Sequence, residues 1–262
     1  MEKNLVYKKV ITVLFLAFLI TVPLSTKKFL VDFGVPISEL NSAFLYLSDL
    51  VLVVVLAVAG IGKTNLVKEK FLFLFGFLSA VSVFLSVNKI FAVYSLTRLF
   101  LVFGLCLVIK SLFARGILNF EKIIKVIAVL GFFEAFVAFL QFKFQGSLGL
   151  KILGEPVIGP FGQGGGNIII QGGRILRAFG TLPHANILAC FLVFGFMAFC
   201  YLYLKSRNPI SRLGSSIGMF FIGLGLIVSF SRSGWIGAVT GIFLIVFWGF
   251  RQEEFRRKAK NL

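Results

Sequence analysis

The chain has 262 residues, of which 58% are hydrophobic and 34 are phenylalanine, and its mean hydropathy is +1.00. A soluble domain of this size cannot bury so much apolar surface, which excludes a water-soluble globular protein and favours an integral membrane protein. The formal net charge of +17 does not indicate nucleic-acid binding, because the 27 Lys and Arg residues lie mostly in short segments between apolar runs.

Eight apolar runs have about the length of a membrane-spanning helix, which needs roughly 17–25 residues. The expected fold is an all-α integral membrane protein with about eight transmembrane helices in a single transmembrane domain, residues 1–262. The first run follows three lysines, but no small-residue cleavage site follows it, so it is interpreted as a retained helix and not a signal peptide. The runs are 10–26, 40–60, 70–87, 93–112, 123–142, 185–204, 214–230 and 234–250.

Lysine and arginine are unequally divided between the two sides of the membrane that these helices define. With a cytoplasmic N-terminus, 18 of the 27 fall on the cytoplasmic side, including those of the basic tail 251–262, and 9 fall on the other side. Positive charge accumulates in cytoplasmic loops, so both termini are predicted to lie inside.

No cofactor and no metal are expected. The three cysteines all lie within apolar runs, which argues against a disulfide framework or a metal cluster. The stretch AVAGIGKTN, 57–65, resembles the end of a nucleotide-binding P-loop, but it lacks the first glycine and follows a membrane helix instead of a strand.

The longest connection, 143–183, is glycine-rich without helical periodicity and is predicted to be a flexible extracytoplasmic loop. It ends in Arg174 and Arg177 and leads into a helix whose start is marked by Thr181 and Pro183. A helix N-terminus offers free N–H groups, and guanidinium groups add bidentate phosphate binding, so the stretch indicates an anion site at the membrane surface. Interfacial arginines also anchor helices to headgroups, and the residues alone leave both interpretations open.

A second polar stretch, VSFSRSGWIGAVTG at 228–241, marks the turn between the last two predicted helices. Arg232 lies at this turn, on the same predicted side as the long loop. Gly234, Gly237 and Gly241 follow at helical spacing and predict a face that lets a neighbouring helix approach closely. Helix packing with one anchoring arginine is the alternative interpretation.

Two acidic residues, Asp49 and Glu134, fall within predicted helices. An ionisable group is costly there unless it is paired or faces a polar cavity. Pairing with an arginine from another helix is favoured for them over a proton relay, which a transporter would use.

Four stretches of the chain resemble the O-antigen ligase and O-antigen polymerase family of polytopic bacterial membrane glycosyl transferases. The similarity covers roughly residues 40–250 and corresponds to the N-terminal two thirds of such an enzyme. The two stretches that contain arginine are its most specific part. The four are LRAFGTLPHANILACFL, SFSRSGWIGAVTGIF, FLQFKFQGSLGLKILGEP at 139–156 and YLSDLVLVVV at 46–55.

The resemblance implies transfer of a glycan from undecaprenyl diphosphate to an acceptor hydroxyl, at the outer face of the bacterial cytoplasmic (inner) membrane. The acceptor in such enzymes is lipid A-core, as in lipopolysaccharide assembly, another glycan or a protein. The resemblance assigns diphosphate binding to Arg177 and Arg232, with Arg174 as a further candidate. The other matching motif residues are structural: Gly180, Thr181, Pro183, Asn186, Ser231, Ser233 and Gly234.

The family's histidine-bearing extracytoplasmic loop, proposed to activate the acceptor hydroxyl, has no counterpart before the chain ends in RQEEFRRKAKNL. His184 is the only histidine and the only catalytic candidate. A structural role is favoured for it, because an imidazole beside a helix N-terminus is biased towards neutrality. A gene fragment, a reduced relative and a split enzyme with a C-terminal partner polypeptide all stay open. The chain alone is expected to bind the lipid but to transfer glycan poorly.

A lipid-linked oligosaccharide flippase or transporter, without transferase chemistry, is the alternative function. A flippase or transporter works by alternating access and would tend to contain internal repeats and broken helices. The sequence shows no convincing repeat, which favours the transferase.

Overall fold

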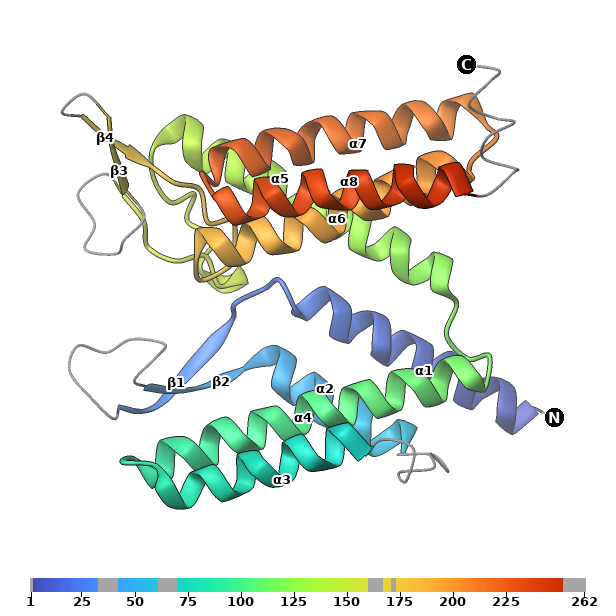
Figure 1. Cartoon of the computed structure of the whole chain (residues 1–262), viewed down its shortest axis with the longest axis vertical. Coiled ribbons are helices and arrows are strands. Elements are labelled where there is room, and N and C mark those ends of the chain that lie inside the picture. The colour runs from blue at the N-terminus through green and yellow to red at the C-terminus, as the bar shows by residue number, and fades with distance from the viewer. Residues whose placement is uncertain (1, 33–41, 61–69, 160–166, 171–172, 252–262) are drawn as a thin grey trace. The chain divides into compact units, whose positions relative to one another are not determined.

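The computed structural model describes residues 2–32, 42–60, 70–159, 167–170 and 173–251, and the protein is 74% helical. Four of the described helices, α4 to α7, are long and apolar enough to cross a membrane, and they identify a helical membrane protein. The α-helices in the described part of the chain are α1 (Glu2–Thr21), α2 (Leu47–Ala59), α3 (Lys70–Leu85), α4 (Lys89–Ala114), α5 (Phe120–Phe144), α6 (Ala185–Lys205), α7 (Pro209–Val228) and α8 (Arg232–Arg251) (Figure 1).

Each of the eight apolar runs overlaps one of these helices, so the predicted order of helices is confirmed, while eight membrane spans stay a prediction. The basic tail falls outside the described residues from position 252 onwards. The chain divides into two compact units, Met1–Ile123 and Ile124–Leu262. The single transmembrane domain expected from the sequence stays a prediction.

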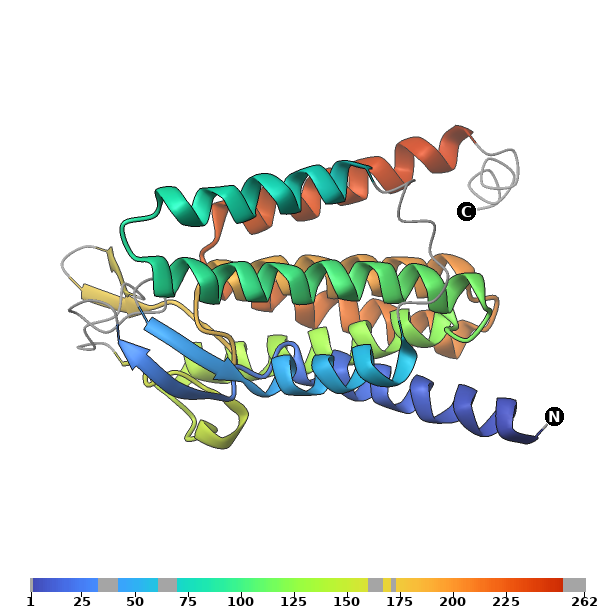
Figure 2. The same cartoon turned by 90° about the horizontal axis from the view of Figure 1, so that it is seen from below.

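The first unit contains a β-hairpin that the sequence analysis did not predict. Strand β1 (Lys27–Asp32) pairs antiparallel with β2 (Ser42–Tyr46), so the expected helix over 40–60 is wrong at its beginning. Helix α2 begins only at Leu47, where the carboxylate of Asp49 accepts a hydrogen bond of 3.4 Å from the backbone N–H of Tyr46. The hairpin lies at the end of this unit where α3 leads into α4 (Figure 2).

The core of the first unit lies between α1, α2 and α4. Apolar side chains at helical spacing face one another there, while most large side chains of α3 are exposed, as expected of a surface that contacts lipid. The core residues are Ile11, Phe15, Phe18, Leu52, Val55, Ala59, Val108, Leu112 and Leu118.

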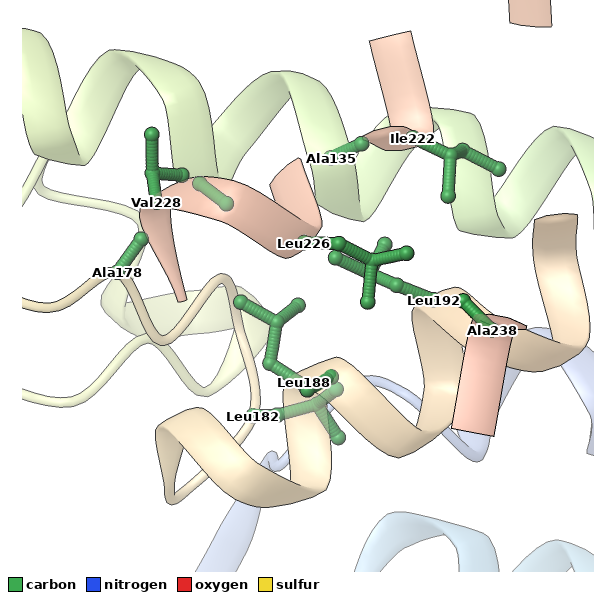
Figure 3. Close-up of a cluster of buried hydrophobic side chains, with 11 residues drawn as sticks. Ala135, Ala178, Leu182, Leu188, Leu192, Ile222, Leu226, Val228 and Ala238 are labelled. Atoms are coloured by element: carbon green, nitrogen blue, oxygen red, sulfur yellow. The ribbon is translucent and has the colours of Figure 1, made fainter. Parts of the chain in front are cut away.

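The second unit packs α5, α6, α7 and α8 around a core of small and aliphatic side chains (Figure 3). Glycine lets the helix backbones approach, because a Cβ at Gly131 of α5 would lie 2.9 Å from Cα of Gly195 in α6. The core residues are Ala135, Ala138, Ala178, Leu182, Leu188, Ala189, Leu192, Ile222, Leu226, Val228 and Ala238.

The described part of the long connection is not a structureless loop, contrary to the sequence prediction. Helix α5 extends to Phe144, and a short 3-10 helix covers Lys151–Leu153. Strands β3 (Asn167–Ile170) and β4 (Gly173–Leu176) form a second antiparallel hairpin. Much of the glycine-rich stretch, 160–166, lies outside the described residues. Figures 1 and 2 place this hairpin at the end of the second unit where α6 and α8 begin.

Candidate functional site

The two arginine-bearing stretches meet in the second unit, although they are far apart in the sequence. The backbone N–H of Ala178 donates a hydrogen bond of 3.0 Å to the carbonyl oxygen of Val228. Nε of Arg177 donates to the carbonyl oxygen of Ser229 at 2.9 Å, and Nη2 donates to Oδ1 of Asn186 at 2.9 Å. The structure thus joins the segment before α6 to the end of α7 and the turn that follows it.

Arg177 is half-buried, and its guanidinium is only partly used by the protein. Desolvation lowers its pKa, but the usual value lies so far above neutrality that the group stays charged. In the described part of the chain, Nη1 has no acceptor, because the hydrogen bonds of this side chain come from Nε and Nη2. The side chain is held in place by neutral oxygens and keeps N–H donors for an anion.

Two helices begin beside Arg177. Helix α6 begins at Ala185 with His184 as its N-cap, and Thr181 and Pro183, which marked the helix start in the sequence, lie in the turn that precedes it. Helix α8 begins at Arg232 after Ser231, whose Oγ accepts a hydrogen bond of 3.4 Å from the N–H of Gly234. The first turn of a helix has N–H groups without helical acceptors, and the helix dipole adds partial positive charge there.

His184 caps α6 through its Nδ1 atom, which accepts a hydrogen bond of 3.1 Å from the backbone N–H of Asn186. Its ring lies 5.7 Å from the ring of Phe179, and the side chain is exposed. A neutral imidazole has one acceptor nitrogen, so Nε2 carries the proton when Nδ1 accepts. This geometry favours the structural role, since the outward nitrogen has no lone pair with which to take a proton.

The other two arginines lie on exposed surface. Arg232 is the first residue of α8, and Arg174 lies in β4 opposite Ile169. Within the described residues neither side chain makes a hydrogen bond or an ion pair. Beside Arg232, the hydroxyls of Ser231 and Ser233 are 3.1 Å apart. The direction of the Arg232 side chain relative to Arg177 stays a prediction.

A buried glutamine that the sequence analysis overlooked holds the segment between Arg177 and α6. Oε1 of Gln141 accepts hydrogen bonds from the backbone N–H groups of Phe179 and Gly180, at 3.0 and 2.8 Å. Its Nε2 donates to the Gly180 carbonyl and to Oε1 of Glu155, both at 2.8 Å. Gln141 and Glu155 both lie within the 139–156 stretch that resembles the family. A glutamine inside an apolar run is the sequence feature from which the role of Gln141 could have been suspected.

The two acidic residues found in predicted helices have different partners. Asp49 pairs with Arg98 of α4, with Nη2 3.5 Å from Oδ1, so the predicted pairing with an arginine from another helix is confirmed for this residue. Glu134 is fully buried in α5 and accepts hydrogen bonds from the backbone N–H and the hydroxyl of Thr181, at 2.8 and 2.6 Å. The predicted pairing of Glu134 with an arginine was wrong, because Thr181 supplies both of the hydrogen-bond donors to its carboxylate.

The glycines of α8 lie against α6, as the sequence predicted. A Cβ at Gly234 would lie 2.6 Å from Cβ of Ala189, and one at Gly241 would lie 2.6 Å from Sδ of Met197. Gly237 lies between them, with Val193 at 3.6 Å. This contact fixes the start of α8 beside the start of α6.

Comparison of the chain with protein-family models, with curated proteins and with solved structures finds no match.

Proposed function

We propose that the chain transfers a glycan from undecaprenyl diphosphate to an acceptor hydroxyl in the bacterial cytoplasmic membrane, like an O-antigen ligase or polymerase. The observation that supports this most directly is the pair of hydrogen bonds from Arg177 to Ser229 and Asn186. The bond to Ser229 joins the two arginine-bearing stretches into one site that contains a partly exposed guanidinium, and the bond to Asn186 attaches that guanidinium to the start of α6.

The chemistry of this site suits a diphosphate. Arg177 has N–H donors left over, and the adjacent starts of α6 and α8 add backbone N–H groups and positive dipole ends. In glycan transfer the diphosphate is the leaving group, and it gains negative charge as the bond to the sugar breaks. Fixed cations and N–H donors aimed at those oxygens stabilise that charge without reorganising.

The predicted topology agrees with this proposal. Eight spanning helices with both termini inside would place the 173–184 segment and the turn before α8 at the outer surface, where lipid-linked glycans are transferred. Both segments lie at the same end of the second unit, so one membrane face would carry the complete diphosphate site. The acceptor, which is lipid A-core, a glycan or a protein, would approach from that face.

Reconstitution in lipid tests the proposal. The purified chain is incorporated into proteoliposomes with a labelled undecaprenyl-diphosphate glycan, and labelled product is measured with each acceptor class, with and without a candidate C-terminal partner polypeptide. We expect Arg177→Lys to reduce lipid binding and any transfer, because an ammonium cannot engage two phosphate oxygens as a fork does.

Arg212→Lys is the matched control for this experiment. Nε of Arg212 also donates to a backbone carbonyl, that of Ser206 at 3.1 Å, but it does so at the start of α7, whereas Arg177 lies beside the end of α7. The control should behave like the wild type. Movement of the labelled lipid between leaflets without any transfer would instead support the alternative, a flippase.

A further inference from the structure

We propose that Glu134 and Gln141 of α5 are positioning residues for Arg177, which they do not touch. They hold the backbone turn that follows Arg177, so that its guanidinium faces the diphosphate in one orientation. The inference rests on the proposed function, because it concerns the placement of the same arginine.

The first support is the burial of both side chains on one face of α5. Glu134 and Gln141 are each 0% exposed, and their spacing of seven residues places them on the same side of the helix, two turns apart. A carboxylate and an amide are costly inside an apolar helix bundle unless they make hydrogen bonds. Here all but one of the bonds go to one short segment, residues 179–181, and the remaining bond joins Gln141 to Glu155.

The second support is that these bonds hold every residue of that segment. Gln141 accepts from the backbone N–H groups of Phe179 and Gly180, and Glu134 accepts from that of Thr181. Three successive N–H groups therefore point at α5, an arrangement that leaves the turn little freedom to rotate.

Gly180 shows how closely the turn is fitted to α5. Its φ of 63° is in the left-handed region, which glycine adopts without strain. A Cβ at this position would collide with Oε2 of Glu134 and would approach Leu188 at 3.0 Å. The conformation and the close contact both require glycine, and the resulting turn is the one that α5 binds.

Two points of attachment follow Arg177 directly along the chain. Ala178, the next residue, donates its N–H to the carbonyl oxygen of Val228, and Phe179 is the first residue held by Gln141. The backbone of Arg177 is thus fixed from α7 and from α5. Loss of the hydrogen bonds to α5 should leave the guanidinium present and charged but no longer oriented towards the diphosphate.

A double-mutant cycle measures this coupling. Binding of undecaprenyl diphosphate to the full chain in nanodiscs of neutral lipid is compared for Arg177→Lys in the wild type, in Glu134→Leu and in Gln141→Leu. We expect Arg177→Lys to weaken binding about tenfold in the wild type, because one charge-assisted bond is lost. In Glu134→Leu or Gln141→Leu, the added Arg177→Lys substitution should weaken binding less than about threefold, since the guanidinium of Arg177 is already misplaced there.

Conservative variants separate positioning from folding. Glu134→Gln should keep the full effect of Arg177→Lys, because its amide can accept from the N–H of Thr181 and donate to the hydroxyl. Ser215→Ala removes a buried hydroxyl of α7 that bonds only within its helix, so it should also keep the full effect. If the leucine variants do not fold, Thr181→Val removes the hydroxyl bond to Glu134, and Thr181→Ser, which keeps the hydroxyl, is its control.

Two results would overturn the inference in distinguishable ways. A tenfold effect of Arg177→Lys in every background would show that Glu134 and Gln141 support the fold but do not position the arginine. Binding by the wild type that does not depend on Arg177 would remove the proposed function itself, and the inference with it.

Discussion

Arg177 and Asn186 are joined by a hydrogen bond of 2.9 Å from Nη2 to Oδ1, so a neutral side chain holds the guanidinium at the start of α6. A carboxylate in the same place would hold the arginine more tightly but would cancel part of its charge. An asparagine at this position therefore suits the proposed anion site.

Asn186→Asp should weaken binding of undecaprenyl diphosphate about tenfold, because the new carboxylate pairs with Arg177 and repels the phosphates. The same variant should unfold at an equal or higher temperature, since a negative charge in the first turn of a helix is favourable. Lipid binding in nanodiscs and thermal unfolding in detergent give the two measurements. Asn208→Asp, at the N-cap of α7, adds the same charge elsewhere and should bind lipid normally. Unchanged binding by Asn186→Asp would contradict an anion site at Arg177.

Gly131→Ala should destabilise the second unit by about 1–3 kcal/mol, the usual effect of an extra methyl group in a packed interface. The added Cβ would lie 2.9 Å from Cα of Gly195, and a backbone atom cannot move aside. Gly223→Ala is the matched control, because a Cβ there meets nothing within 4 Å. It should be neutral or stabilising by up to about 1 kcal/mol. Unfolding in detergent measures both, and equal stabilities would argue against this helix contact.

Much of the helical architecture could be predicted from the sequence, because apolar runs of spanning length have few alternatives in a membrane. The apolar runs locate the eight helices of the described residues, but several helix boundaries depend on polar contacts that a hydropathy pattern does not reveal. The start of α2 at Leu47 depends on Asp49, and the start of α6 depends on His184. The two hairpins were missed because their strands are only four to six residues long and adjoin longer apolar runs.

Only part of the candidate site could be proposed from the sequence. Arg177 and Arg232 were proposed from the sequence because a charge next to an apolar helix is conspicuous and because the motifs resemble a family. Gln141 and Ser229 act through long-range contacts, and Ser229 acts through its carbonyl oxygen, which any residue would supply. Sequence reasoning without coordinates cannot assign a role to a backbone atom.

The ion pair between Asp49 and Arg98 should stabilise the first unit. Asp49→Asn and Arg98→Gln should each lower its stability by roughly 0.5–2 kcal/mol, the range for polar contacts between membrane helices. The double variant should lose less than the sum of the two, because neither charge is then left alone. Thermal unfolding in detergent gives the comparison, with Ser95→Ala on the exposed side of α4 as control. Strict additivity would show that the pair is not coupled.

The predicted orientation is tested by reporter fusions at Asn167 and at the C-terminus. The excess of Lys and Arg on one side predicts that a reporter at Asn167 is active outside and one at the C-terminus is active inside. Asn167 belongs to β3, in the same hairpin as Arg174, so it reports the side on which the candidate site lies. A cytoplasmic signal from Asn167 would place the arginines away from the outer face and would remove the basis for glycan transfer there.

His184→Asn separates the capping role of His184 from a catalytic one. The amide oxygen of asparagine can accept the hydrogen bond that Nδ1 now accepts from the N–H of Asn186, and asparagine is a preferred N-cap, so stability should be retained. His184→Ala should lose about 0.5–2 kcal/mol, because that N–H is left without its acceptor. Lipid binding, and any transfer supported by the wild type, should survive His184→Asn, since an imidazole whose Nδ1 is engaged presents only an N–H outward. Transfer that is abolished in His184→Asn while stability and binding stay at wild-type levels would identify His184 as the base.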